Sequence, residues 1–175
     1  GRLPEGIVVA LMDPEPRVRF ETVQAIWQAK QTHLRSALID WLAQEEDRLV
    51  FYAGWGALRD LSDIAFRKQL LSDDRANVRL AALLGLLERH EMSLEEVLTL
   101  AEKDPDRRIQ QWSMTWAMNP RSPRKMPNST TRIVLEQSVS VDDLMKRANE
   151  ARSSKMRHLY LTMLSRATYE EDDEW

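Results

Sequence analysis

The sequence predicts an all-α fold, an α-solenoid of about five helical hairpins, from three observations. A short phrase returns five times, about 30 residues apart and with a longer last gap. Each phrase carries an apolar stripe with helical spacing, and a polar turn precedes it. Self-similarity at this period is typical of a solenoid, in which no unit buries its own apolar face alone. The phrases occupy residues 18–26, 50–58, 78–86, 109–117 and 156–164.

The phrases are predicted to be helices because of where their apolar residues fall. Positions 0, 5 and 8, counted from the opening residue, lie on one stripe of a helix but cannot all share one face of a strand. We therefore expect the side chains at positions 5 and 8 to be buried. Position 5 is Val23, Trp55, Leu83, Met114 and Leu161. Position 8 is Ile26, Leu58, Leu86, Ala117 and Leu164.

Position 4 is small in four of the five phrases, and a small residue within an apolar stripe lets a neighbouring helix approach closely. We expect each phrase helix to be packed between neighbours. The small residues are Thr22, Gly54, Ala82 and Ser113, and Tyr160 is the exception.

The turns ahead of the helices also repeat. An acid stands five positions before the opening residue in four units, where it can accept from free amides and favour the positive helix end. An arginine follows the opening residue in three phrases, and we expect it to hydrogen-bond the acid of the preceding turn in its own or the adjoining unit, the alternative being a ligand-binding role. The acids are Asp13, Glu45, Asp73 and Asp104; the arginines are Arg19, Arg79 and Arg157.

Second helices are predicted between the phrases, which makes each unit a helical hairpin. Two of them begin with a capping signal, Ser93 with Glu96 and Ser140 with Asp143. The segments are residues 7–12, 34–42, 64–71, 94–101 and 141–148.

We interpret residues 1–175 as one repeat domain that is part of a longer protein, because the chain runs directly into helix. The units lie near residues 3–30, 33–61, 63–90, 93–118 and 132–168, with a loop insertion at 119–131 and an acidic tail at 169–175.

Composition excludes several classes of function. A formal net charge of −3 with 30% charged residues describes a mixed surface, which argues against strong attraction to nucleic acid. Cysteine is absent, so thiolate metal sites and haem attachment are excluded, and no apolar run is long enough for membrane insertion. His33, His90 and His158 lack metal-ligand spacing, and no nucleophile or phosphate-binding motif occurs. We therefore expect no catalytic residue, cofactor or metal.

The loop insertion offers one candidate contact with a partner. It holds three prolines, several hydroxyl residues and the cations Arg121, Arg124 and Lys125, without apolar periodicity. Loops on a rigid scaffold often carry binding function, so these cations could contact an acidic partner. The alternative is a solvated insertion without a role.

Two tryptophans offer a second candidate. Trp112 and Trp116 lie four residues apart on one helix, at positions that another phrase fills with Ala81 and Gly85. We expect at least one of them to be partly exposed, where it could anchor a partner. The alternative is packing between repeats.

The turn sequences resemble HEAT repeats, a family of armadillo-like helical repeats. Asp13-Pro-Glu-Pro-Arg-Val-Arg, Asp73-Asp-Arg-Ala-Asn-Val-Arg and Asp104-Pro-Asp-Arg-Arg-Ile-Gln are similar to the Asp-Pro turn and Val-Arg start of the second HEAT helix. The fifth unit departs from the pattern, with Ala151 in place of the turn acid. The resemblance implies a right-handed superhelix that binds other proteins or neighbouring domains, and hence a non-catalytic scaffold.

The resemblance leaves three further readings. The repeats are similar to the HEAT segment of large bacterial multi-domain proteins with membrane-bound dehydrogenase and c-type cytochrome parts, which implies an extracytoplasmic, periplasmic location and chemistry outside this chain. They are also similar to the HEAT-like alkylpurine DNA glycosylases, DNA-binding enzymes that need a continuous positive groove. HEAT-like tetrapyrrole lyases would need a bilin pocket, which no particular residue marks.

Overall fold

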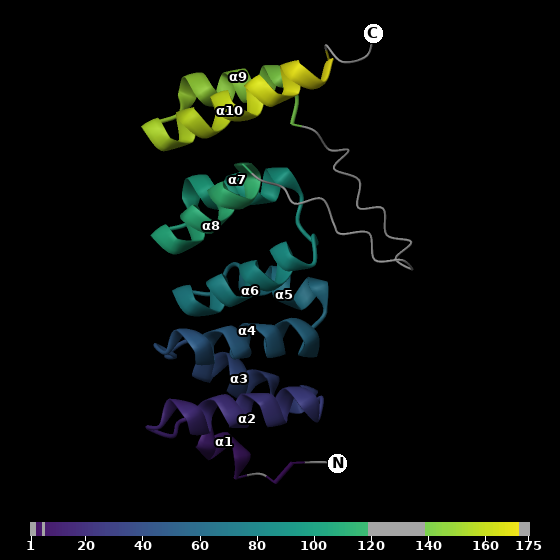
Figure 1. Ribbon diagram of the computed structural model, residues 1–175, viewed down its shortest axis with the longest axis vertical. Helices are drawn as coiled ribbons and strands as arrows, with labels where there is room; N and C mark the ends of the chain where they lie inside the picture. The colour runs from purple at the N-terminus through teal and green to yellow at the C-terminus, as the bar shows by residue number, and fades with distance from the viewer. Residues whose placement is uncertain (1–2, 5, 119–138, 172–175) are drawn as a thin grey trace. The chain divides into compact units, whose positions relative to one another are not determined.

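The computed structural model describes residues 3–4, 6–118 and 139–171, with side chains as far as residue 165 (Figure 1). Ten α-helices and one 3-10 turn are the regular elements of these residues, so the predicted all-α class is confirmed. The predicted loop insertion at 119–131 lies outside the described residues.

All five phrases lie within helices, and the segments between them form the second helices. The phrase helices are α2 (Pro16–Gln28), α4 (Arg48–Leu61), α6 (Ala76–Glu88), α8 (Arg107–Met118) and α10 (Ser154–Glu171). The others are α1 (Ile7–Ala10), α3 (Arg35–Leu42) after the 3-10 turn Thr32–Leu34, α5 (Ile64–Leu70), α7 (Leu94–Lys103) and α9 (Val141–Glu150). Helix α10 continues past the predicted start of the acidic tail at residue 169, as the good helix former glutamate allows.

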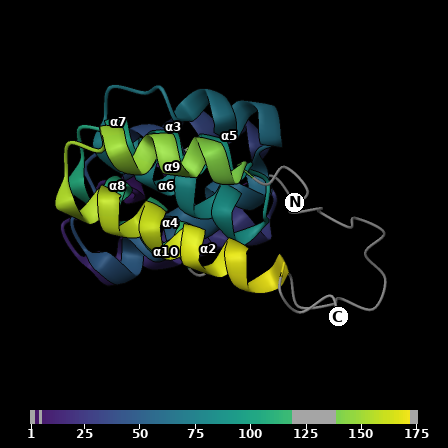
Figure 2. The ribbon, with the colours of Figure 1, turned by 90° about the horizontal axis from the view of Figure 1, so that it is seen from above.

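Adjacent helices pack in pairs within two compact units, Gly1–Glu91 and Met92–Trp175. In the first unit α2 packs on α4 and α4 on α6, while α3 and α5 pack beside them. In the second unit α7 pairs with α8, α10 contacts α8, and α9 lies beside α10 (Figure 2). Phrase helices thus contact phrase helices within each unit.

The predicted apolar stripe is buried at position 8 in every phrase, from Ile26 in α2 to Leu164 in α10. Position 5 divides. Val23 and Leu83 are fully buried, and Trp55 and Met114 are partly buried. The expectation for Leu161 was wrong, because this residue is 50% exposed.

Position 4 is buried throughout, as the small residues predicted. A Cβ atom added to Gly54 would lie 2.5 Å from the ring of Trp41, so α3 approaches α4 as closely as glycine allows. The exception, Tyr160, is 1% exposed, and its hydroxyl donates to Glu102 of α7. The large side chain is therefore accommodated by a hydrogen bond to a neighbouring helix.

The turn acids accept from a backbone amide two residues further on, which belongs to the residue just ahead of each helix. One carboxylate therefore closes each turn before the helix begins. The distances are 2.8 Å for Asp13 to Glu15, 2.8 Å for Glu45 to Asp47, 2.9 Å for Asp73 to Arg75 and 2.8 Å for Asp104 to Asp106.

In four of the five units the side chain after the opening residue donates to a backbone carbonyl of its own turn, and the expected hydrogen bond to a turn acid is made by Arg19, to Glu45 of the adjoining unit. Arg19 reaches the carbonyl of Asp13 at 2.8 Å, and Arg79 reaches that of Asp73 at 2.8 Å. Arg157 does the same to Ala151 at 3.2 Å, although that turn has no acid. In the fourth unit Gln110 replaces the arginine, and its amide reaches the carbonyl of Asp104 at 2.7 Å.

Candidate functional site

The two predicted anchor tryptophans lie on α8 of the second unit, and they differ in exposure. Trp112 is 42% exposed, whereas Trp116 is partly buried and has an interaction partner. The predicted partial exposure is therefore met by Trp112. The candidate cations Arg121, Arg124 and Lys125 lie outside the described residues.

A second candidate lies in the first unit, around Trp27 near the end of α2. A Cβ atom added to Gly56 of α4 would lie 3.0 Å from the six-membered ring of Trp27, so the ring packs where glycine leaves room. One turn further along α4, Asp60 Oδ2 accepts from Trp27 Nε1 at 3.0 Å. Helix α4 therefore fixes both the ring and the polar edge of this tryptophan.

Asp60 also binds two arginines. Arg59 donates from Nε to Oδ1 at 2.7 Å, and Arg89 donates from Nη2 to Oδ1 at 2.8 Å. The hydrogen bond from Arg59 holds the pKa of Asp60 far below its usual value, against the opposing effect of burial, and Arg89 and Trp27 act in the same direction. Asp60 is thus a charged carboxylate that orders three side chains from three segments.

Arg59 is similarly occupied. Besides Asp60 it donates to Glu88 of α6, and its guanidinium lies 5.9 Å from the ring centre of Trp27. The hydrogen bond to Asp60 raises the pKa of Arg59. Arg59 therefore links the ends of α4 and α6 through paired charges and reaches α2 through the ring of Trp27.

Arg67 of α5 is buried behind this network. Its Nη1 donates to the carbonyls of Arg59 and Ser62, and Nη2 donates to Glu91. Carbonyls at a helix C-terminus lack partners within the helix, and a cation there is favoured by the helix dipole. Arg67 thus closes the end of α4, while its Nε is the one buried guanidinium atom without a partner in the described part of the chain.

These groups surround an open cleft of about 1050 Å³. The apolar part of its lining is the Trp27 ring with Leu61, Ile64 and Ala65, and the lining also contains charged and amide groups. The cleft is lined by Gln24, Trp27, Gln28, Lys30, Thr32, Arg59, Asp60, Leu61, Ser62, Asp63, Ile64, Ala65, Arg67, Arg89 and Glu91.

Two turns that bound the cleft use a left-handed residue other than glycine. Lys30 after α2 has φ of 50° and His90 after α6 has φ of 55°. In both turns the next amide donates to the carbonyl five residues back, Gln31 to Ile26 and Glu91 to Leu86. This is the Schellman end of a helix, which usually places glycine at the left-handed position.

Sequence reasoning missed this cleft because its parts are far apart in the chain. Trp27, Asp60 and Arg89 come from the ends of three successive phrase helices. Lys30 and His90 occupy left-handed positions without the glycine that would mark a helix end in sequence. The one available sign was Gly56, a glycine inside an apolar helix.

The described residues contain no group of three or more histidine and acidic side chains that could hold a metal ion. None of their helices has the length and apolar character needed to cross a membrane. The sequence matches no protein-family model, and comparisons with curated proteins and with solved structures gave no match.

Proposed function

We propose that the chain is a non-catalytic scaffold or protein-interaction module, an α-solenoid of about five HEAT-like hairpins with a right-handed superhelical course. The recurring turn carries this proposal. The same acid-to-amide hydrogen bond stands ahead of α2, α4, α6 and α8, and phrase helices pack on phrase helices within each unit. A turn and a helix contact that recur together are what a translational repeat requires.

The partner is a protein or a neighbouring domain of the same chain. Trp112 supports this choice, because an exposed tryptophan on a rigid helix is a common anchor in protein interfaces. Four arginines of the first unit, Arg19, Arg59, Arg67 and Arg79, are engaged with carboxylates or carbonyls, which favours a scaffold over a groove for phosphates. Arg121, Arg124 and Lys125 stay predicted partner contacts.

Quantitative affinity capture tests the role of Trp112. The purified chain, its Trp112→Ala variant and a matched Met145→Ala variant serve as bait in an extract of the source cells. Met145 is a suitable control because it is also an exposed apolar residue, on α9 of the same unit. We expect at least one captured protein to fall about tenfold or more for Trp112→Ala alone, since an anchor is worth about 2 kcal/mol or more.

The captured protein is then purified and titrated against the same three baits. Saturable binding that weakens for Trp112→Ala but not for Met145→Ala supports the proposal. Equal binding by all three, or no saturable binding, contradicts it.

Fluorescence anisotropy with a labelled DNA duplex separates the scaffold from a DNA-binding enzyme. We expect no saturable binding at low salt, because the chain carries a formal net charge of −3 with 30% charged residues of both signs. Binding that falls steeply with added salt would instead indicate phosphate contacts and favour the enzyme.

A further inference from the structure

We propose that the cleft of the first unit binds an extended peptide segment in which an apolar side chain is flanked by one acidic and one basic residue. The site goes beyond the proposed role of Trp112, which lies on α8 of the second unit. Three properties of the cleft lead to this occupant: the apolar part of its lining, its unpaired amides and its two unpaired charges.

The apolar part of the lining suits one apolar side chain. The ring of Trp27 packs against Gly56, and its Nε1 donates to Asp60. Because the side chain is already in position, binding a ligand costs little of its conformational entropy. Ile64 lies in the same lining and is 47% exposed. A prepositioned aromatic ring beside an exposed aliphatic side chain is a favourable place to bury a leucine-sized group.

The wall formed by α2 offers amides for a peptide backbone. Gln24 and Gln28 stand one helical turn apart in the lining, and neither side chain makes a hydrogen bond with another described residue. Each amide can donate and accept, as a peptide group does. The cleft has a volume of about 1050 Å³, and several of its lining residues are exposed to solvent. It therefore has room for several residues of an extended chain.

Most charges in the lining are compensated inside the protein. Arg59 is paired with Asp60 and Glu88, Arg89 with Asp60, and Arg67 with Glu91. These groups fix the walls and leave little charge for a ligand.

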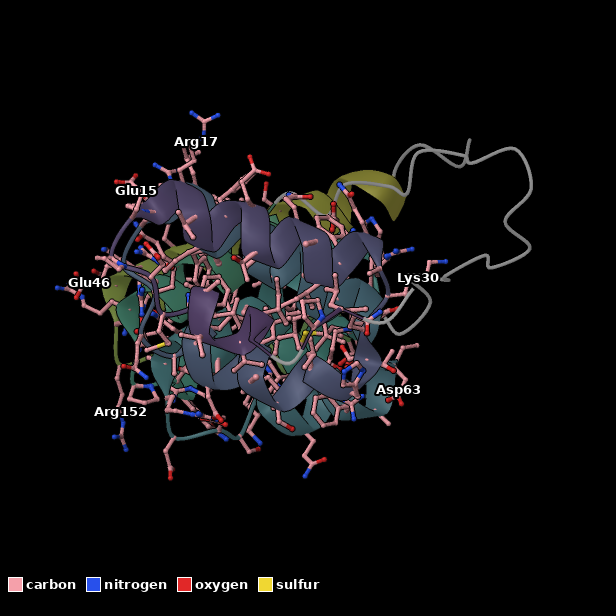
Figure 3. The ribbon with its side chains drawn as sticks, turned by 90° about the horizontal axis from the view of Figure 1, so that it is seen from below. Glu15, Arg17, Lys30, Glu46, Asp63 and Arg152 are labelled. Carbon is pink, nitrogen blue, oxygen red and sulfur yellow. The ribbon has the colours of Figure 1, made fainter. Side chains whose placement is uncertain are left out.

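Lys30 and Asp63 are different. Within the described part of the chain, the ammonium group of Lys30 makes no hydrogen bond or ion pair, and the Asp63 carboxylate accepts only from the backbone amide of Phe66. Figure 3 shows both on one side of the view, away from Glu15 and Arg17 at the other end of α2. Two unpaired charges of opposite sign in one lining match a ligand that carries one charge of each sign.

Nuclear magnetic resonance of the indole N–H groups tests the proposal on the whole chain. A Trp27→Phe variant assigns one of the six tryptophan signals. The probes are serine peptides blocked at both ends, with a central leucine between one glutamate and one lysine. Both orders of the two charges are used, and one or two serines separate each charge from the leucine. We expect one charge order to shift the Trp27 signal saturably, and replacement of the leucine by serine to weaken binding about tenfold or more.

Two variants remove the unpaired charges while keeping the backbone. Lys30→Asn suits the left-handed conformation, and Asp63→Asn keeps an amide oxygen at the start of α5. Each should weaken the best peptide about two- to fivefold, as expected for an exposed ion pair. Lys30→Asp should improve binding of a probe with two lysines.

Arg17→Gln and Glu46→Gln are the matched controls. Both side chains are exposed charges of the same unit outside the cleft lining, and neither should change the affinity. The indole spectrum shows whether each variant is folded. Absence of a saturable shift with every probe overturns the proposal, as does equal affinity for Lys30→Asn, Asp63→Asn and the controls.

Trp112→Ala should leave peptide binding at Trp27 unchanged. A failure at the cleft therefore leaves the proposed role of Trp112 intact, and a failure of the Trp112 experiment leaves the cleft intact.

Discussion

Arg19 binds Glu45 through two nitrogens of its guanidinium group: Nε lies 2.7 Å from Oε2, and Nη2 lies 2.8 Å from Oε1. The Glu45 side chain is 1% exposed and also accepts from the amide of Asp47. Arg19 in turn donates to the carbonyls of Asp13 and Pro14. One buried carboxylate therefore joins the turn before α2 to the turn before α4.

Glu45→Ala should destabilise the protein strongly. The substitution leaves the guanidinium of Arg19 and one turn amide without their partner, and we expect the free energy of unfolding to fall by about 2–4 kcal/mol. Urea denaturation measures this free energy of unfolding. Glu46→Ala, an exposed neighbour, should change it by less than about 0.5 kcal/mol. Equal midpoints for the two variants would show that the ion pair contributes little.

Gln110 should be replaceable by arginine but not by alanine. Its amide reaches the carbonyl of Asp104, as Arg19 and Arg79 reach the corresponding carbonyls of their own turns. Gln110→Ala should lower the free energy of unfolding by about 0.5–1.5 kcal/mol, the usual value of one hydrogen bond. Gln110→Arg should stay within about 0.5 kcal/mol of the parent in the same urea titration. A loss for arginine as large as for alanine would mean that the contact is incidental.

The helices were predictable from sequence because the information is local. The spacing of Val78, Leu83 and Leu86 within one phrase is enough to indicate a helix and its buried stripe. Capping is equally local, and the predicted box at Ser93 and Glu96 is present with both hydrogen bonds, at 2.7 and 3.2 Å.

The exposure of Leu161 and the presence of the cleft were harder to predict. Both depend on which residues of other helices lie nearby. Leu161 occupies the same phrase position as Val23, yet half of it is exposed. The network of Trp27, Asp60 and Arg89 joins residues at the ends of three phrase helices, beyond the phrases themselves, so no pattern within one phrase contains it. That Gln110 takes the place of the arginines also could not be predicted, because it depends on the distance between its side-chain amide and the carbonyl of Asp104.

The protein should lose stability in acid because of Asp60. Its folded-state pKa is held below the unfolded value of about 3.9, chiefly by the hydrogen bond from Arg59. The unfolded state therefore binds more protons at low pH, so the contribution is complete above about pH 5 and is lost as the pH falls below 4. Asp73 and Asp106 act in the same direction, since Arg75 and Arg108 lower their pKa values.

The Asp60→Asn variant isolates the contribution of Asp60 to the loss of stability in acid. Urea midpoints measured between about pH 3 and pH 7 should decline less steeply on the acid side for Asp60→Asn than for the parent. Asp63→Asn is a control on the same cleft that keeps Asp60. If the Asp60→Asn and parent profiles have the same slope, the acid sensitivity comes from other carboxylates.

Gly54→Ala should destabilise the protein although alanine favours helices. The added methyl group would lie 2.5 Å from the ring of Trp41 and 2.7 Å from the side chain of Leu42, both of which are buried. Overpacking of this kind costs about 1–3 kcal/mol, against a gain of about 1 kcal/mol from helix propensity. We therefore expect a lower urea midpoint.

Gly56→Ala provides the comparison two residues along the same helix. Its methyl group would meet the Trp27 ring at 3.0 Å, and because that ring lines the open cleft, a shift of a few tenths of an ångström relieves the contact while Trp27 stays bonded to Asp60. Gly56→Ala should therefore be less destabilising than Gly54→Ala, and it should move the indole signal of Trp27. If Gly56→Ala proves the more harmful of the two, Trp27 is held more rigidly than Trp41, and the close approach of α3 to α4 at Gly54 is not a main determinant of stability.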